Sequence, residues 1–159
     1  MMQINLICVG KLREEYWRNA CAEYEKRLRL FCRFSILEIP EYRLSDRPSG
    51  AQLKAALSSE GKKLIAAAGN SKIISLCIEG TELSSVQLAK RIEHLGVNGN
   101  GRLSFLIGSS FGLGEEIKGK SDFRLSMSPM TFPHQLARVM LCEQIYRAFE
   151  IIHNGKYHK

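Results

Sequence analysis

Short apolar runs alternate with helix-like patterns along this chain, and no other feature limits its fold as strongly. The apolar runs predict strands over residues 3–9, 34–39, 73–78, 103–107 and 123–127. Apolar residues at steps of three or four predict helices over residues 14–31, 51–68, 86–95 and 134–152. Because strands that alternate with helices form parallel sheets, we expect an α/β fold with a mainly parallel sheet flanked by helices. The 159 residues suit one domain, 1–159.

The last helical segment, residues 134–152, carries apolar side chains around nearly its whole circumference. A helix that is apolar on all sides must be buried on all sides. Either this helix lies at the centre of the protomer, or a second subunit covers its outer face. We expect a second subunit, and therefore a homodimer.

The chain has a formal net charge of +7, from 23 Lys and Arg residues against 16 Asp and Glu residues. The charges are spread along the sequence rather than gathered in a tail. Such a surface favours nucleic acid or another polyanion as a partner, although it also serves solubility. The apolar runs are too short to cross a membrane, and the first residues contain no basic leader. We therefore expect a soluble, cytoplasmic protein.

The five cysteines are odd in number, and none of them forms a CxxC pair with another: Cys8, Cys21, Cys32, Cys77 and Cys142. Disulfide frameworks and zinc sites both need paired spacings. We therefore expect buried free thiols in a reducing compartment, and no bound metal ion.

A glycine-rich segment, LSFLIGSSFGLG, occupies residues 103–114 and begins with the fourth predicted strand. In parallel sheets ligands bind where the carboxyl ends of the strands meet, so we expect this turn to contact a ligand. The alternative is a tight connection between a strand and a helix, without a ligand. The segment also matches GxSxG, which is compatible with a serine hydrolase that uses Ser110 as nucleophile and Asp122 or a later Glu as the acid.

Two further segments place polar groups beside the final helix. The first, MSPMTFPH at residues 127–134, is made rigid by two prolines and offers Thr131 as a helix cap. The second is the chain end, where Tyr157, His158 and Lys159 offer a nucleotide an aromatic ring, an imidazole and a cation. Taken alone, the first segment also fits a simple helix-entry loop and the second a frayed basic end.

The segments FLIGSSFGLG, LSMSPMTFPHQLARVMLCEQIYRAFEI and the terminal YHK occur together in this chain, in that order. In this combination the chain resembles the ribosomal RNA large subunit methyltransferase H (RlmH) family of the SPOUT methyltransferases. The resemblance implies an α/β fold with a C-terminal trefoil knot, a homodimer, and S-adenosylmethionine as the cofactor. It also implies methylation of N3 of pseudouridine 1915 in 23S ribosomal RNA, within the assembled ribosome.

The resemblance also assigns roles to residues. It places the cofactor among three loops, at Leu76, Gly108, Met127, Ser128, Pro129, Met130, Thr131 and Phe132. We expect His158 to handle the N3 proton, with Tyr157 and Arg138 as further catalytic residues. His134 and Lys159 are expected to bind the substrate, Lys159 through a phosphate.

The chain departs from the family's pattern at two positions. Ser109 stands where the family's loop usually has its second glycine, and Lys159 stands where some relatives have arginine. The terminal cation is therefore kept, but without the forked donor that arginine provides. Two other functions stay open: a serine hydrolase that uses Ser110, and a non-catalytic module that binds RNA or the ribosome.

Overall fold

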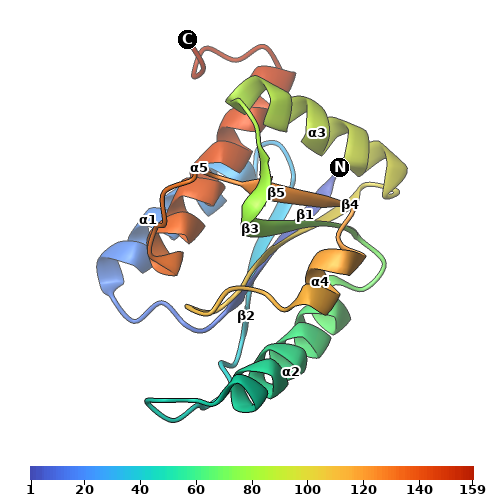
Figure 1. The fold of residues 1–159 in the computed structure, drawn as a ribbon. Coiled ribbons are helices and arrows are strands. Elements are labelled where there is room, and N and C mark those ends of the chain that lie inside the picture. Colours follow the sequence, from blue (N-terminus) through green and yellow to red (C-terminus); the bar gives the residue numbers. More distant parts are fainter.

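The structure is a computed structural model that describes residues 1–159, and it contains five strands and five helices (Figure 1). In chain order these are β1 (Gln3–Val9), α1 (Glu15–Leu28), β2 (Arg33–Ile39), α2 (Gly50–Ala68), β3 (Lys72–Glu82), α3 (Ser85–Asn98), β4 (Arg102–Ile107), α4 (Glu115–Lys120), β5 (Phe123–Ser126) and α5 (His134–Ile152). All five strands and four of the helices lie within a few residues of their predicted positions.

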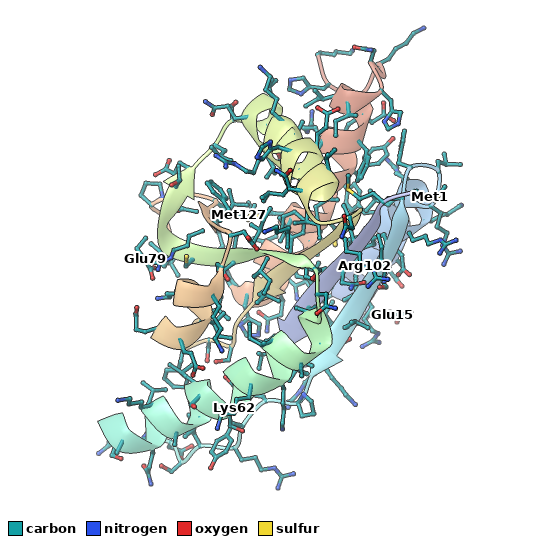
Figure 2. All side chains as sticks on the ribbon, turned by 90° about the vertical axis from the view of Figure 1, so that its right-hand side faces the viewer. Met1, Glu15, Lys62, Glu79, Arg102 and Met127 are labelled. Carbon is teal, nitrogen blue, oxygen red and sulfur yellow. The ribbon has the colours of Figure 1, made fainter.

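The five strands form one sheet in the order β2-β1-β4-β3-β5, and every neighbouring pair is parallel. The predicted parallel sheet is therefore confirmed. Since the strands are parallel, their carboxyl ends meet at one edge of the sheet. Figure 2 shows Glu79 and Met127 toward that edge, and Met1 and Arg102 toward the opposite one. The loops that leave the carboxyl edge include the three to which the sequence assigns a ligand.

Helices cover both faces of the sheet, and alternate β1 side chains show how the faces divide. Ile4 and Leu6 belong to a larger core with α1, α3 and α5, whereas Ile7 and Val9 belong to a smaller core with α2 and α4. Strands that are buried on both faces are apolar at successive positions. This is why the strands are visible in the sequence as mostly apolar runs.

The helix ends follow local chemistry, with two departures from the predictions. Ser84 caps α3 through its side chain, and Gly69, with φ +58°, ends α2. α4 was not predicted, because its six residues bury only Ile117 and so show no helical repeat. Thr131 does not cap α5: the cap position is held by Pro133, and no side chain bonds to the first turn.

α5 lies between α1 and α3 on one face of the sheet (Figure 1). Its inner side is buried, at Ala137, Arg138, Leu141, Cys142, Ile145, Ala148 and Phe149. Its outer side, which we call the apolar strip, is only partly covered, at Leu136, Val139, Met140, Tyr146, Ile151 and Ile152. The protomer alone therefore does not bury α5 on all sides. The homodimer stays a prediction, and the apolar strip is the surface that it would cover.

All five cysteines are free and four of them are buried, in agreement with the predicted thiols. Cys77 alone is partly exposed. The fold brings together no group of three or more His, Cys, Asp and Glu side chains that could hold a metal ion. None of the helices combines the length and the hydropathy that a membrane span requires.

Candidate functional site

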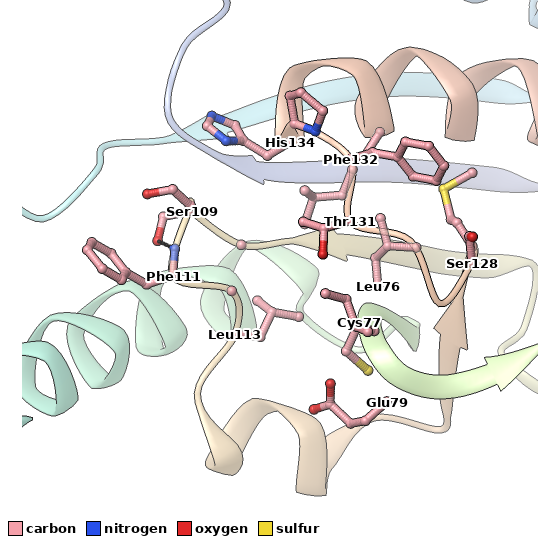
Figure 3. Close-up of a pocket in the computed structure, with 18 of the residues that line it drawn as sticks. Leu76, Cys77, Glu79, Ser109, Phe111, Leu113, Ser128, Thr131, Phe132 and His134 are labelled. Atoms are coloured by element: carbon pink, nitrogen blue, oxygen red, sulfur yellow. Dashed lines mark hydrogen bonds between the residues drawn. The ribbon is translucent and has the colours of Figure 1, made fainter.

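A cavity of about 680 Å³ opens at the carboxyl edge of the sheet (Figure 3). Three segments enclose it: the middle of β3, the glycine-rich turn after β4, and the connection from β5 to α5. The cavity lies within the usual size range of small-molecule sites, about 300–1,000 Å³. The parallel sheet therefore gathers three segments that are far apart in the sequence around one space.

Seven of the eight residues assigned to the cofactor line this cavity: Leu76, Gly108, Met127, Ser128, Met130, Thr131 and Phe132. Pro129 does not line it and is exposed to solvent. In Figure 3, Leu76 and Thr131 point from two different segments into the space between them, with Leu113 on the side of the glycine-rich turn. The fold thus brings together residues that were predicted from separate motifs.

The β3 wall of the cavity is a bulge. Leu76 and Thr81 both pair with Leu125 of β5, so the residues between them leave the regular ladder. Gly80 allows this bulge to approach β5, because a Cβ atom there would be 2.8 Å from the Arg124 carbonyl oxygen. The bulge turns residues 77–79 toward the cavity, which they line.

The glycine-rich turn after β4 closes on itself. The Gly112 N–H donates to the Ser109 carbonyl over 2.8 Å, and Gly112 has φ +79°, which favours glycine. A methyl group at Gly108 would overlap the Gly112 carbonyl. The backbone of the turn itself therefore leaves no room for a side chain at Gly108. From the sequence, we had expected a ligand to be the reason for the glycine.

Ser109, which replaces the family's usual glycine, is buried beneath this turn. Its hydroxyl accepts a hydrogen bond from the Phe111 N–H over 3.3 Å, and Figure 3 shows the hydroxyl pointing away from the middle of the cavity. Glu60 of α2 is also buried; burial raises the pKa of its carboxyl, and a hydrogen bond from the Tyr42 N–H over 2.9 Å lowers it by less. The serine therefore strengthens the turn without filling the cavity.

Serine side chains also shape the connection from β5 to α5. The Ser128 hydroxyl accepts a hydrogen bond from the Met130 N–H over 3.0 Å, and the Ser126 hydroxyl donates to the Ser128 carbonyl over 3.3 Å. Because the turn is held in this way, Met130 is 71% exposed at the mouth of the cavity. An apolar side chain held out to solvent beside a cavity is available to a partner.

His134, predicted to bind the substrate, is the first residue of α5 and lines the cavity. Burial lowers the pKa of its imidazole, against the opposing influence of Glu41 from the loop after β2. The neutral ring is therefore favoured near pH 7. A neutral imidazole offers one N–H donor and one acceptor to a ligand in the cavity.

Arg138, predicted as a catalytic residue, does not line the cavity. Its side chain is 2% exposed and donates a hydrogen bond from Nη2 to the Gly10 carbonyl over 3.0 Å. Nη1 lies 3.7 Å from the Glu38 carboxylate, and Nε and Nη1 have no hydrogen-bond partner. In the protomer, Arg138 joins α5 to the carboxyl ends of β1 and β2.

We expect Arg138→Ala to lower the free energy of unfolding by about 2–4 kcal/mol, because it opens a cavity and leaves the Gly10 carbonyl unpaired. Arg138→Met fills most of the same volume without a charge, so we expect it to cost less than half as much. Urea unfolding followed by circular dichroism measures both values. An alanine variant as stable as the wild type would contradict this structural role.

The C-terminal residues Tyr157, His158 and Lys159 do not reach the cavity of their own protomer. None of the residues 153–159 lines it. α5 begins at the cavity and runs for 19 residues, about 27 Å at 1.5 Å per residue, before the tail starts. The tail, whose end lies beyond α5 in Figure 1, turns at Asn154, with φ +55°. Its Tyr157 side chain contacts Glu143 and Tyr146 of α5. Within one protomer, the fold therefore separates the two groups of predicted site residues.

Sequence reasoning missed several residues that line the cavity. Glu79 and Lys118 form an ion pair there; Lys118 lowers the pKa of the Glu79 carboxyl, and Glu79 raises that of the lysine. Phe111, at the tip of the glycine-rich turn, is 50% exposed. Lys118 lies on the unpredicted α4 and Glu79 in the β3 bulge, so no periodic pattern pointed to either. Phe111 sits in the GSSFG motif, where its place between glycines is a usable signal.

The Cys77 thiol can report ligand binding in the cavity through its rate of chemical labelling. It lines the cavity, whereas the other four cysteines are buried. Burial raises its pKa, so labelling with N-ethylmaleimide should be slow at pH 7 and faster above pH 8.5. A ligand at ten times its dissociation constant should slow labelling about tenfold. Mass spectrometry with S-adenosylhomocysteine measures this protection, and Cys77→Ser is the control. Unchanged labelling would show that the ligand binds elsewhere.

The fold does not assemble the hydrolase alternative. Ser110 is exposed and makes no hydrogen bond with a histidine. Asp122 binds Lys72 over 2.9 Å and accepts from the Ile73 N–H over 2.8 Å, at the amino-terminal ends of β3 and β5. Nucleophile and acid thus lie at opposite edges of the sheet, whereas a triad needs them within hydrogen-bond reach of one base.

Comparison with known proteins agrees with the geometry. A family described as predicted SPOUT methyltransferase matches residues 2–158. Ribosomal RNA large subunit methyltransferase H 1 of Clostridium perfringens is 43% identical over 159 residues, which cover 99% of this chain and 100% of that protein. The chain belongs to the SPOUT methyltransferase family. Ribosomal RNA large subunit methyltransferase H of Clostridioides difficile is 42% identical, with the same coverage.

Solved structures agree on the fold of this SPOUT methyltransferase. A probable methyltransferase from Bordetella pertussis matches with a TM-score of 0.55 and 12% identity, over 92% of this chain and 95% of that one. A probable methylase family protein from Haemophilus influenzae matches with a TM-score of 0.53 and 15% identity, over 99% and 70% of the two chains. At these identities the likeness concerns the fold alone.

Proposed function

We propose that this protein transfers a methyl group from S-adenosylmethionine to N3 of pseudouridine 1915 in 23S ribosomal RNA, in the assembled ribosome. The observation that carries the proposal is the 680 Å³ cavity, which is lined by seven of the eight residues that the resemblance assigns to the cofactor. Full-length identity of 43% to a curated ribosomal RNA large subunit methyltransferase H supports the substrate class. An enzyme that acts on ribosomes works in the cytoplasm.

The residues of the cavity fit S-adenosylmethionine chemically. Leu76, Leu113 and Phe132 offer apolar walls to a flat heterocycle. The ion pair of Glu79 and Lys118 brings both signs of charge to the cavity, and the amino-acid end of the cofactor carries both signs. Ser128 and Thr131 add hydroxyl groups between these regions. No charged side chain besides this pair has to be desolvated to admit the cofactor.

The cofactor, when bound, supplies an electrophilic methyl group on a sulfonium sulfur. The protein must bring N3 of the pyrimidine into line with that methyl group and allow the N3 proton to leave. Alignment of bound reactants contributes about 7 kcal/mol in favourable cases. In this proposal His134, which lines the cavity at the start of α5, contacts the substrate there. Alignment of the substrate with the methyl group is then the main task of the cavity.

The tail residues act, in this proposal, at the cavity of a partner subunit in a homodimer. Tyr157 packs against the base, His158 contacts its reacting face, and Lys159 binds a phosphate. Two observations support a second subunit: the apolar strip of α5, and a second cavity of about 530 Å³ beside it that includes Val139, Met140 and Gln144. The trefoil knot predicted from the resemblance belongs to the same proposal.

The ribosome, rather than free RNA, is the proposed substrate, as the resemblance implies. Residues 1–159 build one sheet and its covering helices. The net charge of +7 still attracts RNA without reading its sequence. Specificity must then come from the shape of the assembled particle around the target nucleotide.

Calorimetry followed by a methylation assay tests the proposal. We expect S-adenosylhomocysteine to bind, and radioactive methyl groups from S-adenosylmethionine to enter 23S RNA in 70S ribosomes lacking this modification. Nuclease digestion and mass spectrometry locate the methyl group at N3 of the nucleotide. Binding without transfer to ribosomes or RNA would reject the proposed substrate. Absence of both binding and transfer would reject the enzyme, and a fluorophosphonate probe would then test Ser110.

A further inference from the structure

The C-terminal tail is held on its own helix by a network of charged and aromatic side chains. Arg147 donates from Nε and Nη2 to Oε1 of Glu143, over 2.9 and 2.6 Å. The Tyr157 hydroxyl donates to the same oxygen over 3.1 Å, and the Arg147 guanidinium lies 4.6 Å from the centre of the Tyr157 ring. The network lies on the C-terminal half of α5, and neither Glu143 nor Arg147 lines the 680 Å³ cavity.

The backbone after α5 brings the tail into this network. Asn154 adopts φ +55°, and the Gly155 N–H donates to the Glu150 carbonyl over 2.7 Å. A side chain at Gly155 would have to displace the Glu150 carboxylate, which lies beside this turn. The reversal directs Tyr157 and His158 back along the helix. The tail is therefore positioned by the chain itself and is not a frayed end.

The contact with Arg147 decides the tautomer of His158. Nη1 of Arg147 lies 3.3 Å from Nδ1 of His158. Arginine has donors and no acceptor, and it does not lose its proton in proteins. Nδ1 must therefore be the acceptor in this contact. A neutral imidazole that accepts at Nδ1 carries its hydrogen on Nε2.

We propose that Arg147 and Glu143 are positioning residues which hold His158 as the Nε2–H tautomer, so that His158 donates a hydrogen bond to a carbonyl oxygen beside N3 of the target base. This inference rests on the proposed function and names how the tail acts in it. It differs from the expectation that His158 takes the N3 proton. With Nδ1 engaged by Arg147 and a hydrogen on Nε2, the ring has no free lone pair to serve as a base.

A donor at this place has a defined effect on the reaction. The N3–H bond breaks, its proton leaves to solvent, and the negative charge spreads over N3 and the two flanking carbonyl oxygens. A hydrogen bond from Nε2–H stabilises that charge, as donors of an oxyanion hole do. N3 then forms its bond to the methyl carbon, and the bond from carbon to sulfur breaks with its electron pair left on sulfur. The atoms balance without a further reactant.

The groups around the tail suit a neutral donor. Those that face Tyr157 and His158 come from α5 and α1: Glu143, Tyr146, Arg147, Glu150, Tyr24 and Arg27. Burial and the contact with Glu143 raise the pKa of Tyr157 to about 12, so its phenol keeps donating to Glu143 throughout the range of the experiment. Tyr157 therefore stays neutral between pH 6 and 8.5.

Two variants of His158 separate a donor from a base. In His158→Gln the side-chain oxygen can accept from Arg147 and the amide N–H can donate in place of Nε2–H, but the amide is not a base. We expect His158→Gln to keep the single-turnover methylation rate of ribosomes within about tenfold of the wild type, and His158→Ala to lose about 10²–10³-fold. Equal losses in the two variants would overturn the proposal.

The pH dependence of the wild-type rate gives an independent answer. If solvent takes the proton, the single-turnover rate rises about tenfold per pH unit from pH 6 to 8.5, following ionisation of the imide. If an imidazole takes the proton instead, the rate levels off above about pH 6.5, the ordinary pKa of a free histidine side chain. A plateau above pH 7 would therefore overturn the proposal. Wild-type protein that fails to methylate ribosomes at all would reject the proposed function instead.

A double-mutant cycle tests whether Arg147 acts through His158. Arg147→Met should slow methylation with the affinity for S-adenosylhomocysteine unchanged, and adding it to His158→Ala should cause no further loss. Losses that multiply would show a separate, structural effect of Arg147 and contradict the positioning role. Lys156→Ala, an exposed tail residue outside the network, is the matched control and should match the wild type.

Discussion

Deletion of residues 157–159 is expected to lower ribosome methylation by about 10³-fold or more, because it removes the contacts that we propose between the tail and the reacting base. The dissociation constant for S-adenosylhomocysteine should stay within about twofold of the wild type, since none of these residues lines the cofactor cavity. Single-turnover assays with modification-free ribosomes and calorimetry measure the two quantities. Turnover that survives the deletion would remove the tail from the mechanism.

Mixed dimers show which cavity the tail serves. A chain with the tail deleted has an intact cavity, and a Gly108→Trp chain has an intact tail with a blocked cavity. If the tail acts across the dimer, mixing these inactive chains under conditions of subunit exchange restores about a quarter of the wild-type sites. If the tail acts on its own cavity, the mixture stays inactive. The distance that α5 places between tail and cavity predicts recovery.

Gly108→Ala is expected to weaken S-adenosylhomocysteine binding by about 100-fold, close to 2.7 kcal/mol. The added methyl group would overlap the Gly112 carbonyl, and that carbonyl belongs to a turn whose neighbouring N–H is already bonded to Ser109. The turn must open to admit the methyl group, and the cavity wall opens with it. Calorimetry measures the affinity, and urea unfolding measures any accompanying loss of stability.

Gly119→Ala provides the matched control for this prediction. A Cβ atom at Gly119 has no neighbour within 4 Å, and the residue lies in α4, outside the cavity. This variant should bind as tightly as the wild type. If Gly108→Ala also binds normally, the turn tolerates a larger opening than its packing indicates. The close packing of Gly108 against Gly112 would then not be needed for cofactor binding.

The strands could be predicted from the sequence because both faces of a parallel sheet are buried, so that β1 and β4 appear as mostly apolar runs. α2 and α3 were visible through their apolar repeats. α4 was not, since six residues with one buried side chain give no period to detect. Local signals therefore predicted every element except α4, which is too short to show a repeat of apolar residues.

The cavity was only partly predictable. Glycine-rich and proline-containing motifs marked the turn after β4 and the entry to α5, and both line the cavity. The β3 bulge and the pair of Glu79 with Lys118 were missed, because they depend on how β3 meets β5 and on where α4 lies. Gly80 is the residue that allows the bulge, but in the sequence it is one glycine among 13.

The sequence by itself determined the elements, the parallel sheet and the motifs that mark the family, because hydrophobic period and turn chemistry act over a few neighbouring residues. Only the tertiary structure decided which of the candidate residues line the cavity and which lie elsewhere. His134 and Arg138 are one helical turn apart, yet one lines the cavity and the other is buried against Gly10. His158 meets Arg147 because the chain reverses after α5. Those outcomes depend on which surfaces the sheet and helices bring together, and that information is spread over the whole chain.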